Sequence, residues 1–408
     1  MIRPAGAPCE LEKKRLAFPW KVPHSSPVRR LRARRRALLA VTAILTAGLL
    51  LLSCPSGLEP QEDDPVDEQT PSGDPALPGF DPATDELVAT GTVYDADDGL
   101  AAGKLRAPDE ILLERDGERV VAAGVVSKYN DGLSYLPFGS DAWVAIALPQ
   151  GSDELAGLTC DAGYVYTGAG SDVLTVPAGG DTADAVSLLS DGTVITALRT
   201  AEERVFIGTT TTALTTTLDD LVSDPSAKPQ PISDTAVPIH VTSFAVAESV
   251  VYVGARSSKD GSRDVSSSGG LYSWDAAAAT DVAWHAEDPN VSVYDLLVAS
   301  GALYVASFDG LHLLNDDGTL VPLDALVHPD TAAQPAVHDL SADNGVIYAA
   351  TTDGLWYSPD GGGAWRLLEP GNGLPGELSG VPIGSVTALG DRVYLGVGGY
   401  GVVELRWQ

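Results

Sequence analysis

The chain has 408 residues and a formal net charge of −31, with 56 acidic side chains against 25 basic ones. Such an acidic surface repels nucleic acid and anionic lipid headgroups, so neither is an expected partner. The acids predict solubility, and binding of divalent cations is the alternative. No stretch carries the dense, regularly spaced oxygen ligands of a calcium loop, so we assign no metal site and expect no cofactor.

The N-terminal region combines a basic stretch with a short apolar run. Residues 29–54 read "RRLRARRRALLAVTAILTAGLLLLSC". The run is short for a transmembrane helix but suits a signal peptide; a plain transmembrane anchor is the alternative. Its end resembles a prokaryotic lipobox, which implies cleavage after residue 53 and fatty acylation of Cys54. Met1 is the only methionine, so Val28 is a second candidate for the true start.

The segment after this leader predicts a spacer. Residues 1–53 hold 11 of the 25 basic but only 2 of the 56 acidic residues, so the predicted mature chain carries a net charge of −40. Residues 54–86 begin with the predicted lipidated cysteine and continue as an acidic, proline-rich tether with almost nothing to bury, which predicts disorder. Only Cys160 would remain as a thiol, which excludes an intrachain disulfide and a cysteine-based zinc site.

Residues 87–408 contain a repeat made of short β-type runs. Seven segments align on the central residues Val121, Tyr166, Phe206, Tyr252, Tyr304, Tyr348 and Tyr394, at intervals of 40 to 52 residues. A strand-based period of this length is typical of propeller blades. The sequence therefore predicts an all-β fold, a seven-bladed β-propeller of four-stranded antiparallel blades, with the six aromatic centres packed between blades.

Three further features refine the expected blades. Gly or Ala stands two residues after every centre, and we expect Gly208 and Gly254 to lie on the innermost strands, where only small residues fit. An apolar residue stands eight positions before six of the centres, and we expect Leu389 to take its part in the seventh. Residues 86–95 are expected to form an outer strand of the C-terminal blade, because ring closure removes exposed sheet edges.

The stretch "LWYSPDGGGAWRLLEP" (355–370) resembles the Asp-box of sialidases and of many non-enzymatic propellers. The resemblance implies a hairpin at the blade perimeter in which side chains bond turn amides, a glycine takes positive φ and a tryptophan packs between blades. The matching residues are Ser358, Asp360, Gly362 and Trp365. A degenerate copy, without the glycines, is formed by Tyr272, Ser273, Asp275 and Trp284.

No residue set for catalysis stands out. A sialidase would need three converging arginines; Arg204, Arg256 and Arg392 are interpreted as solvated turn residues at equivalent hairpins. A Gly-x-Ser-x-Gly nucleophile elbow is missing. Paired carboxylates of another glycosidase stay open, because the chain has too many acids to select a pair. We expect no catalytic residue, and a secreted carbohydrate-active enzyme is the alternative.

The later repeats add a glycine turn and a second strand, as in "FDGLHLL" and "TDGLWYS". Over residues 110–408 this arrangement resembles the propeller repeats of hybrid two-component sensor ectodomains. We therefore predict a monomeric binding or scaffold module in the cell envelope, outside the cytoplasm. Its expected partners are the lipid bilayer, through Cys54, and an envelope protein or a small-molecule or glycan ligand on one propeller face.

Overall fold

The computed structural model describes residues 80–83, 85–94, 110–116, 119–125, 132–137, 140–152, 155–161, 163–177, 179–189, 192–223, 228–232, 240–256, 269–275, 285–288, 291–315, 317–330 and 332–408. All described strands belong to one compact unit, residues 61–315 and 319–408. The predicted leader, Cys54 and most of the predicted tether lie outside the described residues. Within the described part, no helix is long and apolar enough to span a bilayer.

The first four blades are sheets of consecutive antiparallel strands. The first holds β2 (Glu110–Asp116), β3 (Arg119–Val125), β4 (Gly132–Pro137) and β5 (Val144–Ile146). The second holds β6 (Leu155–Asp161), β7 (Tyr164–Ala169), β8 (Asp172–Pro177) and β9 (Asp184–Ser187). The third holds β10 (Ile195–Ala201), β11 (Arg204–Thr209), β12 (Ala213–Thr217) and β13 (Gln230–Pro231), with the helix α2 (Leu218–Ser223) after β12. The fourth holds β14 (His240–Ala247), β15 (Val250–Arg256), β16 (Gly270–Asp275) and β17 (His285–Asp288).

The remaining three blades vary this plan at their outer edges. The fifth holds β18 (Val293–Ala299), β19 (Ala302–Ser307), β20 (Gly310–Leu314) and β21 (Leu320–Pro322), followed by the 3-10 turn η3 (Asp324–Leu326). The sixth holds β22 (Val337–Asp343), β23 (Val346–Thr351), β24 (Leu355–Ser358) and β25 (Arg366–Pro370), and the short β26 (Gly373–Leu374) adds to it in parallel before η4 (Gly376–Leu378). The seventh combines β27 (Ile383–Leu389), β28 (Arg392–Val397) and β29 (Gly401–Trp407) with β1 (Leu87–Tyr94).

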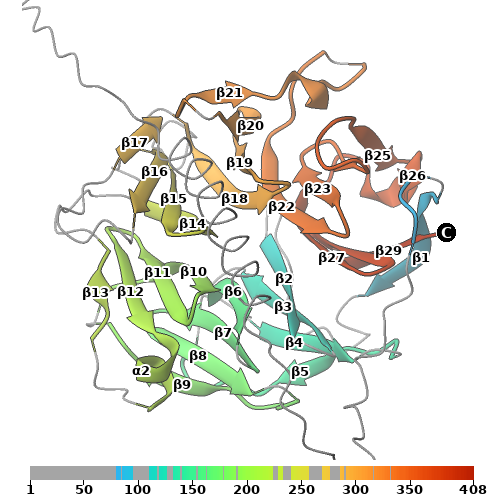
Figure 1. Cartoon of the computed structure of the whole chain (residues 1–408). Coiled ribbons are helices and arrows are strands. Elements are labelled where there is room, and N and C mark those ends of the chain that lie inside the picture. The colour runs from blue at the N-terminus through green and yellow to red at the C-terminus, as the bar shows by residue number, and fades with distance from the viewer. Residues whose placement is uncertain are drawn as a thin grey trace, which may run out of the picture. The chain divides into compact units, whose positions relative to one another are not determined.

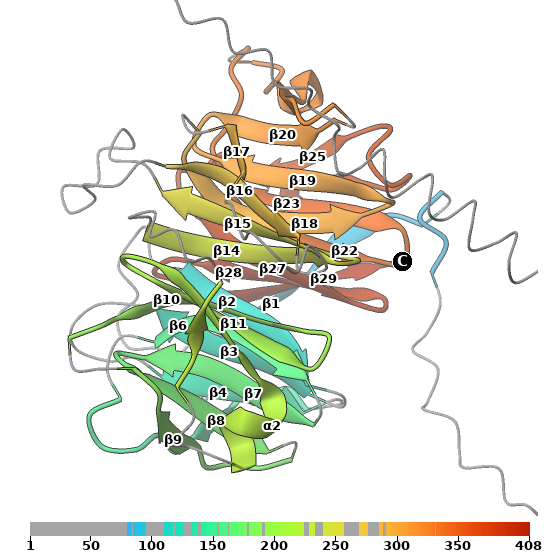
Figure 2. The same cartoon turned by 60° about the vertical axis from the view of Figure 1, so that its left-hand side comes forward.

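The seven first strands close a ring. In chain order β2, β6, β10, β14, β18, β22 and β27 each lie against the next, and β27 lies against β2 (Figure 1). Successive strands of each blade follow one another outward from that ring, and Figure 2 shows the stacked blades from the side. The predicted all-β, seven-bladed propeller of antiparallel blades is confirmed.

The ring is closed by the N-terminal strand. β1 pairs antiparallel with β29, Leu87 facing Trp407 and Tyr94 facing Val402, and the two strands lie side by side in Figure 1. The expectation that residues 86–95 supply the outer strand of the C-terminal blade is confirmed. Because β1 and β29 are separated by almost the whole domain in sequence, this pairing joins the two ends of the ring.

The six aromatic centres lie buried on the second strands of their blades, each at most 5% exposed. Two of their phenols contact the following blade: the Tyr304 hydroxyl donates to the Gly361 carbonyl, and the Tyr348 hydroxyl accepts from Trp407 Nε1 at 2.9 Å. Burial raises the pKa of Tyr166 to about 12 and that of Tyr348 further, so both phenols stay neutral. These side chains join neighbouring blades.

The expected place of the small residues is wrong. Gly208 and Gly254 lie on β11 and β15, the second strands, and not on the innermost strands. A Cβ on either glycine would come within 2.5 Å of the Cγ1 of Val241 or Val293, at the start of the next blade's first strand. The closest atoms therefore belong to the neighbouring blade, and the first strand of the same blade adds contacts at 2.7 Å for Gly254 and 3.0 Å for Gly208.

The expected role of Leu389 is also wrong. Val386 stands eight positions before Tyr394, is 3% exposed and faces Leu395, as Leu340 faces Ala349 one blade earlier. Leu389 instead faces Arg392 across the hairpin. The seventh repeat needs no shortened turn, because β-branched valine fills the position that leucine or phenylalanine takes in the others.

Candidate functional site at the start of the inner strands

Six of the seven first strands begin with a β-bulge. The register with the second strand shifts by one residue near the start of β6, β10, β14, β18, β22 and β27. The extra residues are Gly157, Thr196, Thr242, Tyr294, His338 and Gly384. Because a bulge breaks the alternation of a strand, it re-aims the side chain of the extra residue in the four blades where that residue is not glycine, and all six bulges lie near the start of their strands.

The bulged side chains contact the next blade. Thr196 Oγ1 donates to the Val241 carbonyl at 2.6 Å, and Thr242 Oγ1 donates to the Val293 carbonyl at 2.7 Å. The ring of Tyr294 likewise meets the ring of His338 on the following blade, with centroids 5.8 Å apart and planes tilted by 31°. The same local geometry thus builds a threonine bridge in two blades and an aromatic contact in the next.

A cation completes this aromatic contact. Arg256, the last residue of β15, holds its guanidinium carbon 5.3 Å from the centroid of the Tyr294 ring, within cation–π range. Burial, and then the charge of Arg256, lower the pKa of His338, so its imidazole is neutral near neutral pH. Among the described residues, His338 Nε2 is buried and has no hydrogen-bond partner. We call Arg256, Tyr294 and His338 the mouth cluster.

Two carboxyl groups lie directly beside this cluster. Asp295 and Asp339 follow the bulged residues of β18 and β22, and the charge of Asp295 acts on Asp339. Each also accepts a backbone N–H of the next blade: Asp295 Oδ2 from Leu340 at 3.0 Å and Asp339 Oδ2 from Val386 at 2.7 Å. Burial, and then the charge of Asp295, raise the pKa of Asp339 well above its usual range. The protonated form of Asp339 is therefore favoured in the folded state.

The carboxyl pair belongs to a set of links between first strands. On β22, Ser341 Oγ accepts from the Ala388 amide and Asp343 Oδ2 accepts from the Gly390 amide. Between the second and third blades, Thr159 and Thr200 join through hydroxyls 2.8 Å apart. First strands have no ladder partner on their axial side, so polar side chains of the preceding blade satisfy their N–H groups.

The mouth cluster was missed by sequence analysis. Its members come from three blades, and no local motif links them. A signal did exist: "VYDL" at 293–296 and "VHDL" at 337–340 place an aromatic ring and then an aspartate at the same blade position. Chemically, a guanidinium, an aromatic face and a neutral imidazole can bind polar or anionic groups.

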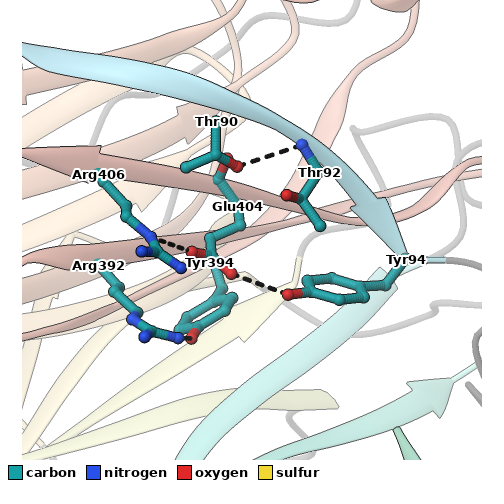
Figure 3. Close-up of polar contacts among 7 residues, drawn as sticks. All are labelled: Thr90, Thr92, Tyr94, Arg392, Tyr394, Glu404 and Arg406. Carbon is teal, nitrogen blue, oxygen red and sulfur yellow. Dashed lines mark hydrogen bonds and ion pairs between the residues drawn. The ribbon is translucent and has the colours of Figure 1, made fainter. Parts of the chain in front are cut away.

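The seventh blade, which β1 completes, contains a second polar cluster that supports β1 (Figure 3). Glu404 on β29 is fully buried and accepts from the Tyr94 hydroxyl at 2.9 Å and from Arg406 Nε. Thr90 Oγ1 donates to the Glu404 carbonyl at 3.0 Å and accepts from the Thr92 amide at 3.1 Å. Burial and Glu404 both raise the pKa of Tyr94, which keeps its hydroxyl a donor. This cluster holds the closing strand in place.

The four Asp-box residues lie on the perimeter hairpin between β24 and β25. Ser358 Oγ accepts from the Gly362 amide at 2.7 Å, and Asp360 Oδ1 accepts from the Ala364 amide at 2.8 Å. Gly362 has φ +109°, and a Cβ there would strike the Tyr304 hydroxyl. Trp365 is half-buried against the aromatic core of the fifth and sixth blades. These contacts support the turn, and none reaches the mouth cluster.

The degenerate copy of this motif is only partly described. Ser273 is buried on β16. Tyr272 is buried too, and its hydroxyl donates to the Gly269 carbonyl. Trp284 and the side chain of Asp275 lie outside the described residues.

The three arginines that were interpreted as equivalent do not share one position. Arg204 and Arg392 stand at hairpins, where Arg204 is exposed and Arg392 donates to the Tyr394 hydroxyl at 3.4 Å. Arg256 lies at the opposite end of its strand, half-buried in the mouth cluster, so its interpretation as a solvated turn residue is wrong. Within the part of the chain that is described, no three His, Cys, Asp or Glu residues are placed to hold a metal ion.

No protein-family model matches the chain, and no curated protein matches its sequence. Solved propellers do match its fold. YCF48 bound to D1 peptide superposes with a TM-score of 0.54 and 12% identity, over 81% of this chain and 97% of that one. A catalytically inactive virginiamycin B lyase from Staphylococcus aureus with Quinupristin gives 0.57 and 8%, over 79% and 99%.

A sensor ectodomain also matches. The extracellular domain of the hybrid two component system BT3049 from B. thetaiotaomicron gives a TM-score of 0.53 and 13% identity, over 78% of this chain. The match spans only 41% of that domain. The resemblance to sensor propellers therefore holds at the level of the fold.

Proposed function

We propose that this chain is a lipid-anchored β-propeller that works as a binding or scaffold module in the cell envelope, and that it receives its partner on the face of the mouth cluster. The observation that carries the proposal is convergence: three blades bring Arg256, Tyr294 and His338 together at the start of the first strands. A buried imidazole nitrogen with no partner among the described residues is costly unless something else binds it.

Binding is favoured over catalysis by the way the polar groups are used. Both aspartates beside the mouth cluster accept hydrogen bonds from backbone amides of the next blade. A carboxyl engaged in this way is poorly placed to attack or protonate a sugar. The Asp-box residues are likewise engaged in their own turn. Hydrolysis of aryl glycosides or sialosides by the purified chain, abolished by Asp339→Asn, would overturn this part of the proposal.

Photo-crosslinking in intact cells can test which face of the propeller contacts the partner. Phe308 is 51% exposed, and its amide donates to the Ser292 carbonyl, just before β18. A photoreactive residue at position 308 is expected to capture the partner, and Arg256→Gln in the same chain should reduce the yield. Val321 is 41% exposed on the outer strand of the same blade and is the matched control. Identical products from both positions would contradict the proposed face.

The anchor is tested separately. The lipobox predicts that Cys54→Ser leaves the leader uncleaved or releases the protein from membranes, because several acyl chains at ~0.8 kcal/mol per buried methylene supply the attachment. Ser53→Ala leaves the cysteine in place and is the control. A Cys54→Ser protein that is still processed and still sediments with membranes would exclude acylation at this residue.

A further inference from the structure

The two rings of the mouth cluster stand on residues that the strand pairing leaves out. The register of β18 shifts at Tyr294, and the register of β22 shifts at His338. The extra residue of a bulge has no residue opposite it on the partner strand. The two strands are neighbours around the ring (Figure 1). Movement of either ring therefore breaks no residue pair of its own blade.

The His338 imidazole meets an aromatic ring and a positive charge. Its centroid lies 5.8 Å from that of the Tyr294 ring, and the guanidinium carbon of Arg256 lies 5.3 Å from the centroid of the same ring. An imidazolium carries an N–H on both nitrogens. Because Nε2 is buried and has no hydrogen-bond partner among the described residues, its N–H in the charged ring would be a buried donor without an acceptor. The geometry therefore suits the neutral ring and opposes the charged one.

Two carboxyl groups lie beside the rings. Asp295 and Asp339 directly follow the two bulged residues in the chain, and each accepts a backbone amide of the next blade. The charge of Arg199 on β10 also acts on Asp295. Burial, and then the charge of Arg256, nevertheless lower the pKa of His338. The carboxyls therefore do not offset the cost of charging the imidazole.

The other strands packed against β22 add no acid. β27 has no titratable side chain, and β19 and β23 hold only the phenols of Tyr304 and Tyr348, whose pKa values burial raises. On β14, His240 lies opposite Arg256. Histidines gain charge and carboxylates lose it as pH falls, so the surroundings of the Arg256 guanidinium become more positive in acid.

We infer that the contact between Tyr294 and His338 is an acid-sensitive switch. Uptake of a proton from solvent by the His338 imidazole drives its ring away from Arg256 and Tyr294, and the mouth cluster opens. The partner is then held near neutral pH and released in mild acid. This release rests on the proposed function, whereas the opening itself does not.

The direction and size of the effect follow from proton linkage. In the closed cluster the pKa of His338 lies below its ordinary value of 6.5, and in the opened, hydrated ring it returns to that value. The open form therefore binds the proton more readily. The ratio of open to closed cluster rises as pH falls below 6.5, by at most about tenfold per pH unit, and the rise ends at the lowered pKa.

NMR of the full chain in detergent, with isotope-labelled histidine and tyrosine, tests the opening without a partner. We expect the His338 signal to titrate with a midpoint below 6.5 and the Tyr294 ring signals to shift with the same midpoint. Arg256→Gln should raise the midpoint. In His338→Phe, which keeps a ring but has no site for the proton, the Tyr294 signals should not shift; His338→Gln replaces it if that variant does not fold. A midpoint at or above 6.5, or Tyr294 signals that stay constant while His338 titrates, would overturn the switch.

Other histidines provide the controls. His328 Nε2 lies 3.5 Å from Glu369 Oε2, on strands and loops away from the mouth cluster. His328→Gln and His240→Gln should both leave the shift of the Tyr294 signals in place. Loss of the shift in either variant would show that another histidine drives the movement.

Cross-linking from position 308 tests the release. In isolated membranes the yield at about pH 5.5 should fall below the yield at about pH 7.5, but not in His338→Phe. Equal yields at both pH values, with Tyr294 signals that shift, would overturn the release of the partner. No cross-linked product at either pH would refute the proposed function, and the titration of the two rings would still decide the switch.

Discussion

The perimeter hairpin of the sixth blade and the mouth cluster use polar side chains in opposite ways. At the hairpin, the side-chain oxygens of Ser358 and Asp360 accept hydrogen bonds from amides of their own turn. At the mouth, each residue comes from a different blade, and the described residues leave His338 Nε2 without a partner. The group with the conspicuous sequence spacing therefore supports its own turn, and the group without one is the site that we propose for recognition.

This contrast predicts that the mouth cluster loses its geometry when the packing beneath it is disrupted. Gly254→Leu would place a side chain against Val293 and Ser243, which lie 2.5 and 2.7 Å from the position of a Cβ. We expect a loss of about 3 kcal/mol or more in the free energy of unfolding, because overpacking displaces the start of β18 and with it Tyr294. Chemical denaturation measures the loss. Gly301→Ala is the control, since a Cβ there meets nothing within 4 Å, although its positive φ adds some strain. Wild-type stability of Gly254→Leu would refute the packing described at this end.

The hairpin is expected to matter for stability alone. Trp365→Ala should cost about 3 kcal/mol, the low end for tryptophan truncation, because the side chain is only half-buried. Trp365→Phe should cost less, since among the described residues the indole nitrogen has no hydrogen-bond partner. Thermal melting gives both values, and cross-linking from position 308 should be unchanged in any variant that remains folded. Loss of cross-linking in a folded variant would tie the hairpin to recognition.

The parts of the fold that sequence predicted are those fixed by repetition. Aromatic centres every 40 to 52 residues identified the blades, and an unpaired strand at 86–95 had only the last blade to join. The small residues after the centres were placed on the wrong strand because spacing alone does not say which neighbour sets the limit. Contact of Gly208 with Val241 of the next blade depends on how blades stack, which no single repeat encodes.

The mouth cluster was harder to predict from the sequence for a related reason. A bulge is an extra residue in one strand relative to its partner, so it is visible only when the pairing is known. Arg256 was grouped with Arg204 and Arg392 although it stands at the other end of its strand. The paired "VYDL" and "VHDL" segments were the one available signal, and they make sense only once both blades are aligned.

A smaller effect is expected from the carboxylate of the hairpin. The amide of Ala364, and then the Ser358 hydroxyl, lower the pKa of Asp360. A lowered pKa means that this contribution to stability is present above the ordinary carboxyl range, near pH ~4, and is lost as pH falls through the folded value. Asp360→Ala should therefore lower the melting temperature at neutral pH, by less than Trp365→Ala does, and the difference from wild type should shrink in acid. A difference that is independent of pH would show that the charge has no part in the turn.

The subtlest prediction concerns Asp339, whose pKa shifts the other way. Burial and Asp295 favour the protonated form in the folded state, so the contribution of this group is present at acid pH and is lost as pH rises through the raised pKa. Loss of one proton limits the slope to ~1.4 kcal/mol per pH unit.

Asn at this position resembles the protonated acid: its oxygen can accept from the Val386 amide and its nitrogen can donate to Asp295. Asp339→Asn should thus flatten the decline in stability that begins as pH rises above the ordinary carboxyl range, near pH ~4, while keeping the fold. Asp343→Asn is the control, because Asp343 accepts the Gly390 amide from the same strand. Stability curves measured by denaturation across pH test this prediction, and a wild-type slope in Asp339→Asn would show that the titration of Asp339 does not cause the decline.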